Sequence, residues 1–411
     1  MNPAEKEPDL RVQNGKMFVA LMPYLFLKET QDFGEATFLS TADTSFQPFI
    51  ENAPAIKTLA SRFTDNHGNK TKPSALLLSA DISDDPRLWE IAAGIRNGYA
   101  IACIARGWQD TVGALNCHGN LYSDQYDFYA FLPTQNGQGL ICLSPSFSSN
   151  SSLKHFQAQI YPDVPFAPPL GQPRVDEKLW PVVHACWKHY FLSSGSSSEN
   201  SWPFKALFRS LAYAFKAARM PKGCDDLLFD YGINIGLWLS AFECLLRPEH
   251  ELFHYERLFE IFEDREWKSP RLAAKQPFQI GKKIYTLNFV QRVIGETYLL
   301  RNDFLHGNPV TIEKLTKPAT IKCGALSHIL PILYKIAVEE FAAKEGFVQK
   351  PDRSKLEKLL NEGQFVEGMF EMLDDNRLEE ALVTFEFGRC QTYDEQLAER
   401  GLKRVERRSA E

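Results

Sequence analysis

The chain of 411 residues lacks a hydrophobic run of about 20 residues, the length that a membrane-spanning helix needs. Its first residues are acidic and polar and lack the apolar core of a secretion signal. Eight cysteines are scattered without a Cys-x-x-Cys pair, which is typical of free thiols in a reducing compartment. We therefore expect a cytoplasmic protein without contact to a membrane.

Motifs of several large enzyme classes are also missing. The sequence has no Gly-x-Ser-x-Gly, no P-loop, no Gly-x-Gly-x-x-Gly after a strand and no His-Glu-x-x-His. These absences argue against esterases of the hydrolase fold, P-loop nucleotide hydrolases, dinucleotide-dependent enzymes and zinc proteases. His184, Cys186 and His189 stand close together, but no second cluster supplies further ligands for zinc. We expect neither a metal site nor another cofactor.

The composition is that of a globular protein, with 44% hydrophobic and 24% charged residues, and the length suits two or three domains. A net charge of −6 argues against a general DNA-coating protein. The charge is uneven, because residues 201–350 carry 21 basic and 17 acidic side chains whereas the segments before and after are acidic. This middle segment is where we expect a polyanion to bind, unless the excess is chance.

A serine-rich stretch at 193–201 separates two regions with different patterns, and we interpret it as a linker. Residues 1–192 are strand-rich with apolar runs bounded by turn-forming residues, which predicts a mixed α+β domain with a sensing or regulatory role. Helices are expected over Pro86–Ile95 and Asp176–Phe191. The expected strands are Met17–Phe26, Ala36–Leu39, Ala75–Leu78, Tyr99–Ala105, Tyr126–Leu132 and Gly139–Leu143.

After the linker the apolar spacing becomes that of amphipathic helices. We expect an all-α bundle over 202–346 and a charged helical tail over 347–411, so that the fold class of the whole chain is α+β. The expected helices of the bundle cover 203–220, 226–247, 250–263, 284–306 and 320–345.

The segment Tyr298-Leu-Leu-Arg-Asn-Asp-Phe-Leu-His-Gly307 carries the residues most suited to chemistry. Arg301 is always charged and can neutralise a phosphate, and His306 titrates near neutrality and can move protons. On a regular helix the two side chains would diverge, but Gly307 allows the last turn to loosen. The pair therefore suits phosphodiester chemistry, with a helix-capping histidine beside a surface arginine as the alternative.

This segment resembles the Arg-x4–6-His motif of HEPN domains, with Asn302 after the arginine. The upstream helix Leu237-Trp-Leu-Ser-Ala-Phe-Glu-Cys-Leu-Leu246 resembles the Ala-x-Glu-x-Leu-Leu helix of the Apea-like HEPN subgroup, and Arg301-Asn-Asp-Phe-Leu-His-Gly307 resembles the motif ending of that subgroup. The resemblance covers residues 201–346. It implies a helical bundle that forms a homodimer and cleaves RNA without metal, with the motif residues of two chains in one composite site.

The resemblance also implies roles for individual residues. His306 would be the acid or base, Arg301 would clamp the phosphate, and Asn302 would orient the phosphate or the histidine. The 2′-hydroxyl would attack the adjacent phosphate and leave a 2′,3′-cyclic phosphate. Many members of the family act in toxin–antitoxin or other anti-phage systems, which suggests an abortive-infection effector with tRNA as one candidate substrate and a phage-derived trigger at the N-terminal domain.

Glu243 stands in a nearly all-apolar helix, where an unpaired carboxylate is costly. We expect it to face Arg301, either to orient that side chain for catalysis or only to close the bundle. Asp303 is a further candidate for supporting the site. The candidates for contacting RNA are Lys282, Lys283, Lys314 and Lys317.

Two other functions stay open at this point. Some HEPN domains have lost catalysis and bind a nucleotide or a protein, and others are toxins that a separate antitoxin keeps silent.

Overall fold

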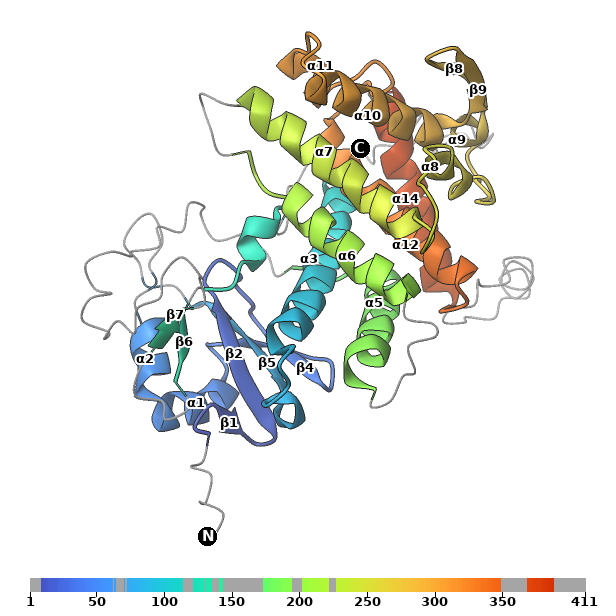
Figure 1. Ribbon diagram of the computed structural model, residues 1–411. Coiled ribbons are helices and arrows are strands. Elements are labelled where there is room, and N and C mark those ends of the chain that lie inside the picture. The colour runs from blue at the N-terminus through green and yellow to red at the C-terminus, as the bar shows by residue number, and fades with distance from the viewer. Residues whose placement is uncertain are drawn as a thin grey trace, which may run out of the picture. The chain divides into compact units, whose positions relative to one another are not determined.

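The computed structural model describes residues 9–61, 63, 70, 72–113, 121–129, 131–134, 140–142, 173–193, 202–221, 227–348 and 368–387 (Figure 1). The chain forms two compact units. The first comprises 1–107, 118–197 and 218–220, and the second comprises 108–117, 198–217 and 221–411. The fold is α+β, as the sequence predicts, because a small antiparallel sheet near the N-terminus precedes a largely helical region.

An antiparallel sheet of five strands in the order β1-β2-β5-β4-β3 forms the centre of the first unit. Its three inner strands are almost wholly buried, which explains their continuous apolar sequences. The predicted strands at 36–39 and 75–78 are confirmed, and the one at 17–26 ends earlier. The strands are β1 (Val12–Gln13), β2 (Lys16–Met22), β3 (Gln31–Asp32), β4 (Ala36–Ser40) and β5 (Ser74–Ser79).

Helices cover both faces of this sheet. On one face α1 (Gln47–Asn52) and α2 (Pro54–Ala60) contribute to a buried apolar cluster with β2, β4 and β5. On the other face Phe38 of β4 stacks on Tyr99 of α3 (Leu88–Gly113) with ring centroids 3.9 Å apart. Trp180 of α5 (Leu179–Trp187) meets Tyr99 edge-on at 5.5 Å. The sheet therefore lies in an aromatic and aliphatic core.

Two predictions in this unit are wrong. Residues 99–105 form part of α3 and not a strand, because their apolar run continues the buried face of a long helix. Residues 123–126 form a 3₁₀ turn, so only the end of the strand predicted over 126–132 exists. The shorter elements are η1 (Thr44–Phe46), η2 (Ala80–Ile82), η3 (Ser123–Tyr126), β6 (Phe131–Pro133), β7 (Leu140–Cys142) and the π-helical η4 (Lys188–Leu192).

The second unit is built around four long helices. Ser210 of α6 donates to the carbonyl of Ala241 in α7 at 2.6 Å and lies 2.6 Å from the hydroxyl of Tyr334 in α12. Trp238 and Phe242 of α7 pack against the ring of Tyr334. These four helices are α6 (Trp202–Ala217), α7 (Leu227–Leu246), α10 (Phe289–Leu305) and α12 (Leu326–Lys344), and the tail adds a further long helix, α14 (Gly368–Phe387).

A β-hairpin interrupts this helical unit, so the prediction of an all-α bundle is wrong at this point. Strands β8 (Gln276–Ile280) and β9 (Lys283–Leu287) pair around Gly281, whose φ of +60° suits a glycine in a tight turn. Residues 284–287 are therefore strand, although the sequence predicts the start of a helix there. Short helices complete the unit: α8 (Arg257–Glu260), α9 (Pro270–Ala273) and α11 (Ile312–Thr316).

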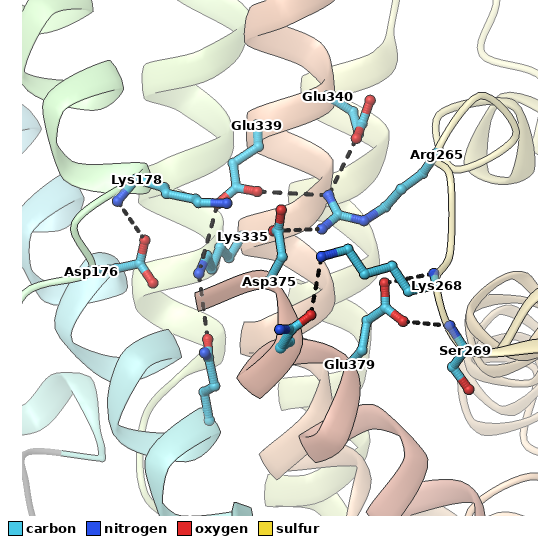
Figure 2. Close-up of polar contacts among 12 residues, drawn as sticks. Asp176, Lys178, Arg265, Lys268, Ser269, Lys335, Glu339, Glu340, Asp375 and Glu379 are labelled. Atoms are coloured by element: carbon cyan, nitrogen blue, oxygen red, sulfur yellow. Dashed lines mark hydrogen bonds and ion pairs between the residues drawn. The ribbon is translucent and has the colours of Figure 1, made fainter. Parts of the chain in front are cut away.

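A buried ionic network holds the tail helix α14 (Gly368–Phe387) in the second unit (Figure 2). Lys335 of α12 is fully buried with its amino group 3.7 Å from Glu339. The guanidinium of Arg265 lies 3.3 Å from Glu340 of α12 and 3.5 Å from Asp375 of α14. Residues 368–387 of the predicted tail are therefore helical. The rest of 347–411, apart from residues 347 and 348, lies outside the described residues.

Candidate functional site

The C-terminus of α10 positions the predicted histidine. The backbone N–H of Gly307 donates to the carbonyl of Phe304 at 3.3 Å, and that of Asn308 donates to the carbonyl of Asp303 at 2.9 Å. With a φ of +73° at Gly307, these bonds form a Schellman cap, which satisfies the last carbonyls of the helix. His306 is the C-cap residue and is exposed to solvent. The helix cap thus fixes the backbone at His306, while the residue stays exposed to solvent.

Arg301, one turn before this cap, forms an ion pair with Glu243 of α7. Both side chains are half-buried, with exposed fractions of 22% for Arg301 and 27% for Glu243. Burial raises the pKa of Glu243, and the charge of Arg301 opposes that rise. The sequence-based expectation that Glu243 faces Arg301 is confirmed. The contact is charge-assisted in a partly dry setting, which restricts the arginine to one orientation.

The guanidinium of Arg301 keeps donors beyond those used by Glu243. An arginine carries five N–H groups in a planar fork. Its carbon Cζ lies 5.6 Å from the ring centroid of Tyr298, one helical turn earlier. Within the part of the chain that the structure describes, its buried Nε has no hydrogen-bond partner. The side chain is therefore oriented by one carboxylate and one ring and could still bind an anion.

The backbone of α7 comes close to α10 beside these residues. A Cβ atom at Gly232 would lie 2.3 Å from the ring of Phe304, so a larger residue here would force that ring to move. One turn later there is room for a side chain, because a Cβ atom at Gly236 would lie 3.9 Å from Cγ of Arg301, an ordinary van der Waals distance. The glycine at 232 thus makes room for the Phe304 ring between the two helices that carry Glu243 and Arg301.

Asn302 and Asp303 contribute to the helix end. The carbonyl of Asn302 accepts a hydrogen bond from the N–H of His306 at 3.0 Å. The carboxylate of Asp303 accepts one from the side-chain amide of Asn308 at 2.9 Å. Both side chains are half-buried. The described contacts of Asp303 thus stabilise the turn after the helix, and its predicted support of the catalytic pair stays a prediction.

The four candidate lysines fall into two groups at opposite ends of α10. Lys282 and Lys283 lie in the β8–β9 hairpin that leads into the helix, and the amino group of Lys283 is 3.1 Å from Glu256. Lys314 and Lys317 belong to α11 and its C-cap, after the helix. All four side chains are exposed. The two groups precede and follow α10, whose 17 residues span about 25 Å at 1.5 Å per residue.

Exposed apolar side chains surround the helix end that carries His306. Leu305 has an exposed fraction of 62%, and Ile312 of the following α11 has 42%. From the start of α7, Phe229 is 59% exposed and Ile233 is 51% exposed. The ring of Phe229 meets that of Phe304 edge-on at 5.8 Å, which places the two helix ends together. We call these four residues, Phe229, Ile233, Leu305 and Ile312, the apolar rim.

Three tyrosines in contact with one another, Tyr255, Tyr285 and Tyr298, lie beside Arg301 and are not predicted from the sequence. We call them the tyrosine series. The rings of Tyr255 and Tyr298 are stacked with centroids 5.2 Å apart, and the hydroxyl of Tyr255 is hydrogen-bonded to that of Tyr285 in β9. The hydroxyl of Tyr285 donates to Glu256 at 3.1 Å. Tyr298 alone carries a signal in the sequence, because it precedes Arg301 by one helical turn.

Comparison of the chain with protein families, curated proteins and solved structures found no match. Among the described side chains, no group of three or more His, Cys, Asp or Glu residues is placed to hold a metal ion. None of the described helices is long and apolar enough to cross a membrane. The four cysteines whose side chains the structure describes, Cys103, Cys186, Cys244 and Cys323, are free thiols.

Proposed function

We propose that the protein is a metal-independent endoribonuclease whose active residues are Arg301 and His306. The observation that carries the proposal is the half-buried Glu243–Arg301 ion pair, with an exposed histidine five residues after the arginine at the end of α10. An oriented guanidinium with unused donors suits a phosphate, and an exposed imidazole five residues later at the same helix end suits proton transfer. The resemblance of the segment to the HEPN motif supports the same chemistry.

In the proposed reaction the 2′-hydroxyl of one ribose attacks the adjacent phosphorus, and the bond from phosphorus to the 5′ oxygen of the next nucleotide breaks. A histidine accepts the proton of the 2′-hydroxyl, and a second acid gives a proton to the leaving 5′ oxygen. Arg301 neutralises the charge that develops on the phosphate oxygens, while Glu243 holds it and Asn302 helps to orient the phosphate. The products carry a 2′,3′-cyclic phosphate and a 5′-hydroxyl.

The need for two proton carriers favours a homodimer. Each chain offers one histidine in the proposed site, so a second copy would supply the second imidazole. The apolar rim around His306 supports this arrangement, because exposed apolar patches mark surfaces that bind partners. A twofold axis close to Leu305 would bring two His306 rings towards one cleft.

The biological role that fits the resemblance is anti-phage defence in the cytoplasm. In this role the effector cleaves cellular RNA, such as tRNA, when a phage-derived signal reaches the N-terminal unit. The α+β fold of that unit differs from the helical fold of the second unit, which suits a division between sensing and cleavage. This assignment rests on the family analogy and not on the site itself.

The two alternatives make different predictions. A binding module without catalysis would leave RNA intact under all conditions, although the Glu243–Arg301 pair is compatible with it as a structural contact. A toxin held silent by a separate antitoxin would arrest growth when it is expressed alone. Growth of cells that express the chain with and without His306→Ala distinguishes these cases.

Cleavage of total RNA in the presence of EDTA tests the proposal. We expect His306→Ala to lower the rate by about 10²- to 10⁴-fold, the usual contribution of a general acid or base. The matched control is His254→Ala, which removes another exposed histidine of the same unit and should leave the rate unchanged. Equal rates for wild type and His306→Ala would show that the acid–base assignment is wrong, and loss of activity in EDTA would show that a metal is required.

A further inference from the structure

The segment that leads into α10 is strongly basic. Every charged side chain between Trp267 and Gly295 is a lysine or an arginine, and the segment comprises α9, the β8–β9 hairpin and the first part of α10. An uninterrupted series of one sign on a surface element is the electrostatic pattern of a polyanion-binding site. The basic residues are Lys268, Arg271, Lys275, Lys282, Lys283 and Arg292.

Some of these charges have protein partners. Arg292 is 3.0 Å from Glu386 of α14, and Lys283 is 3.1 Å from Glu256. Lys275 and Lys282 are exposed, and the described part of the chain shows no ion pair for either. These two amino groups, one just before β8 and one at the hairpin turn, are therefore free to bind phosphate groups.

The tyrosine series connects this hairpin with Arg301. Tyr285 of β9 contacts Tyr255 through the hydroxyl groups, Tyr255 stacks on Tyr298 at an interplanar angle of 24°, and the Arg301 guanidinium lies over Tyr298. All three tyrosines are half-buried. Aromatic rings and guanidinium planes are the groups on which unpaired bases stack.

The same face of α10 continues to the histidine. Arg301 and Asn302 follow Tyr298 by three and four residues, and Leu305 follows them by four and three, so all four lie along one side of the helix. His306 follows directly at the cap. A continuous strip thus runs from the basic hairpin over the stacked tyrosines to the arginine and the histidine.

We infer that unpaired RNA lies along this strip, with its backbone held by Lys275 and Lys282 at the hairpin and one base stacked at Tyr298. The inference rests on the proposed function for the position of the cleaved phosphate, and it adds the path and the kind of substrate. Single-stranded RNA fits because a base must be free to stack, whereas the bases of a duplex are hidden in its helix. The part of α10 from Tyr298 to His306 rises about 12 Å, which corresponds to three to four stacked nucleotides at about 3.4 Å each, and the hairpin lengthens the path.

Binding experiments on the His306→Ala variant test this inference without interference from cleavage. The probes are a labelled oligoadenylate longer than about seven nucleotides and its duplex with oligouridylate, each measured over a range of salt concentrations. The variants are Lys275→Ala with Lys282→Ala, Tyr298→Leu and Tyr298→Phe. The control is Lys205→Ala with Arg209→Ala, which removes the same charge from the exposed side of α6.

We expect the hairpin variant to weaken binding of the single strand and to lower the slope of log affinity against log salt by about 1.4, since each phosphate contact contributes about 0.7. Tyr298→Leu should weaken binding roughly tenfold, whereas Tyr298→Phe keeps the ring and should bind normally. The duplex should bind more weakly than the single strand and should respond little to Tyr298→Leu. The α6 control should bind like its parent.

Three results would overturn the inference. They are an unchanged salt slope in the hairpin variant, equal binding by Tyr298→Leu and Tyr298→Phe, and displacement of the RNA by polyglutamate of matching charge as readily as by unlabelled RNA. Failure of the nuclease proposal is distinguishable, because hairpin-dependent binding would persist while the protein with His306 intact leaves RNA uncut. Conversely, cleavage that is insensitive to the hairpin would retain the nuclease and exclude the path.

Discussion

The sheet of the first unit lies between rings and aliphatic side chains, although Arg106 and Asp176 are buried elsewhere in that unit, whereas the second unit joins its helices through a network of charged groups. Phe38 and Tyr99 stack on one face of the sheet, and the opposite face carries a wholly apolar cluster. In the second unit Lys335 is fully buried and Arg265 is bound by carboxylates from two helices. Apolar packing involves no titratable group and depends little on pH, but buried charges are sensitive to the loss of a partner.

This contrast extends to the candidate site. The half-buried Glu243–Arg301 pair belongs to the second unit, and so do the exposed histidine and the basic hairpin. A charge that is partly buried keeps its orientation and still reaches solvent, which is what binding of a phosphate needs. The predictions below test whether the two units differ in this way, from the largest expected effect to the smallest.

The buried network should respond most strongly. Arg265→Met removes the guanidinium that the carboxylates of Glu340 and Asp375 share, and we expect it to lower the free energy of unfolding by about 3–5 kcal/mol. Arg257→Met is the matched control, because its partner Glu251 is 64% exposed and surface pairs contribute at most about 1 kcal/mol. Urea denaturation measures both values. Equal losses of unfolding free energy in the two variants would show that the buried ion pairs stabilise the fold no more than the exposed one.

The second unit should also lose stability in acid through His328. Burial lowers the pKa of this histidine, which stacks on Trp108, to about 4. The unfolded chain binds the proton near pH 6.5 and the folded chain does not, so this stabilisation is present above pH 6.5 and is lost as the pH falls from 6.5 to 4. The loss is at most about 3 kcal/mol.

Unfolding at pH 7.5 and pH 5 should show this loss in the wild type and a smaller one in His328→Phe, which keeps a stacking ring. In the first unit, burial raises the pKa of Tyr99 well above its ordinary value, so the ring stays neutral at both pH values. Phe38→Leu, which alters the ring that stacks on Tyr99, should therefore cost the same at both. The same pH dependence in wild type and His328→Phe would contradict the assignment.

Two glycines with a side chain packed closely against them, one in each unit, allow effects on stability to be separated from effects on activity. A Cβ atom would lie 2.4 Å from Val183 at Gly98 in the first unit and 2.3 Å from Phe304 at Gly232 in the second. We expect Gly98→Ala and Gly232→Ala each to cost about 1–3 kcal/mol, but only Gly232→Ala to lower RNA cleavage, because Phe304 lies between Arg301 and His306 in α10. Gly236→Ala has room and should preserve cleavage. Thermal unfolding and cleavage rates measure these effects.

The smallest expected effect concerns Glu243. A double-mutant cycle of Glu243→Gln and Arg301→Gln should give a coupling energy of about 1 kcal/mol in unfolding, because both side chains are half-buried. Glu243→Gln should also lower the rate of RNA cleavage, since the guanidinium loses its orienting charge. A cycle without coupling and an unchanged rate would leave Arg301 without a demonstrated partner.

The sequence predicts the parts of the site that follow from local rules or from a single strong constraint. Gly307 predicts the end of α10. A glutamate in an apolar helix is costly to bury without a cation, and this predicts that Glu243 pairs with Arg301. The run at 99–105 is mispredicted because a short apolar segment fits a strand and a buried helix equally well. The stacking of Tyr255 on Tyr298 joins segments over 40 residues apart, and no local pattern encodes it.

The chemistry of the RNA ends tests the central claim most directly. Total RNA is incubated with the protein in EDTA, and the termini of the fragments are identified by mass spectrometry. The proposed roles of Arg301 and His306 predict 2′,3′-cyclic phosphate and 5′-hydroxyl ends that disappear with His306→Ala. Fragments with 3′-hydroxyl and 5′-phosphate ends, or cyclic ends that persist without His306, would contradict these roles.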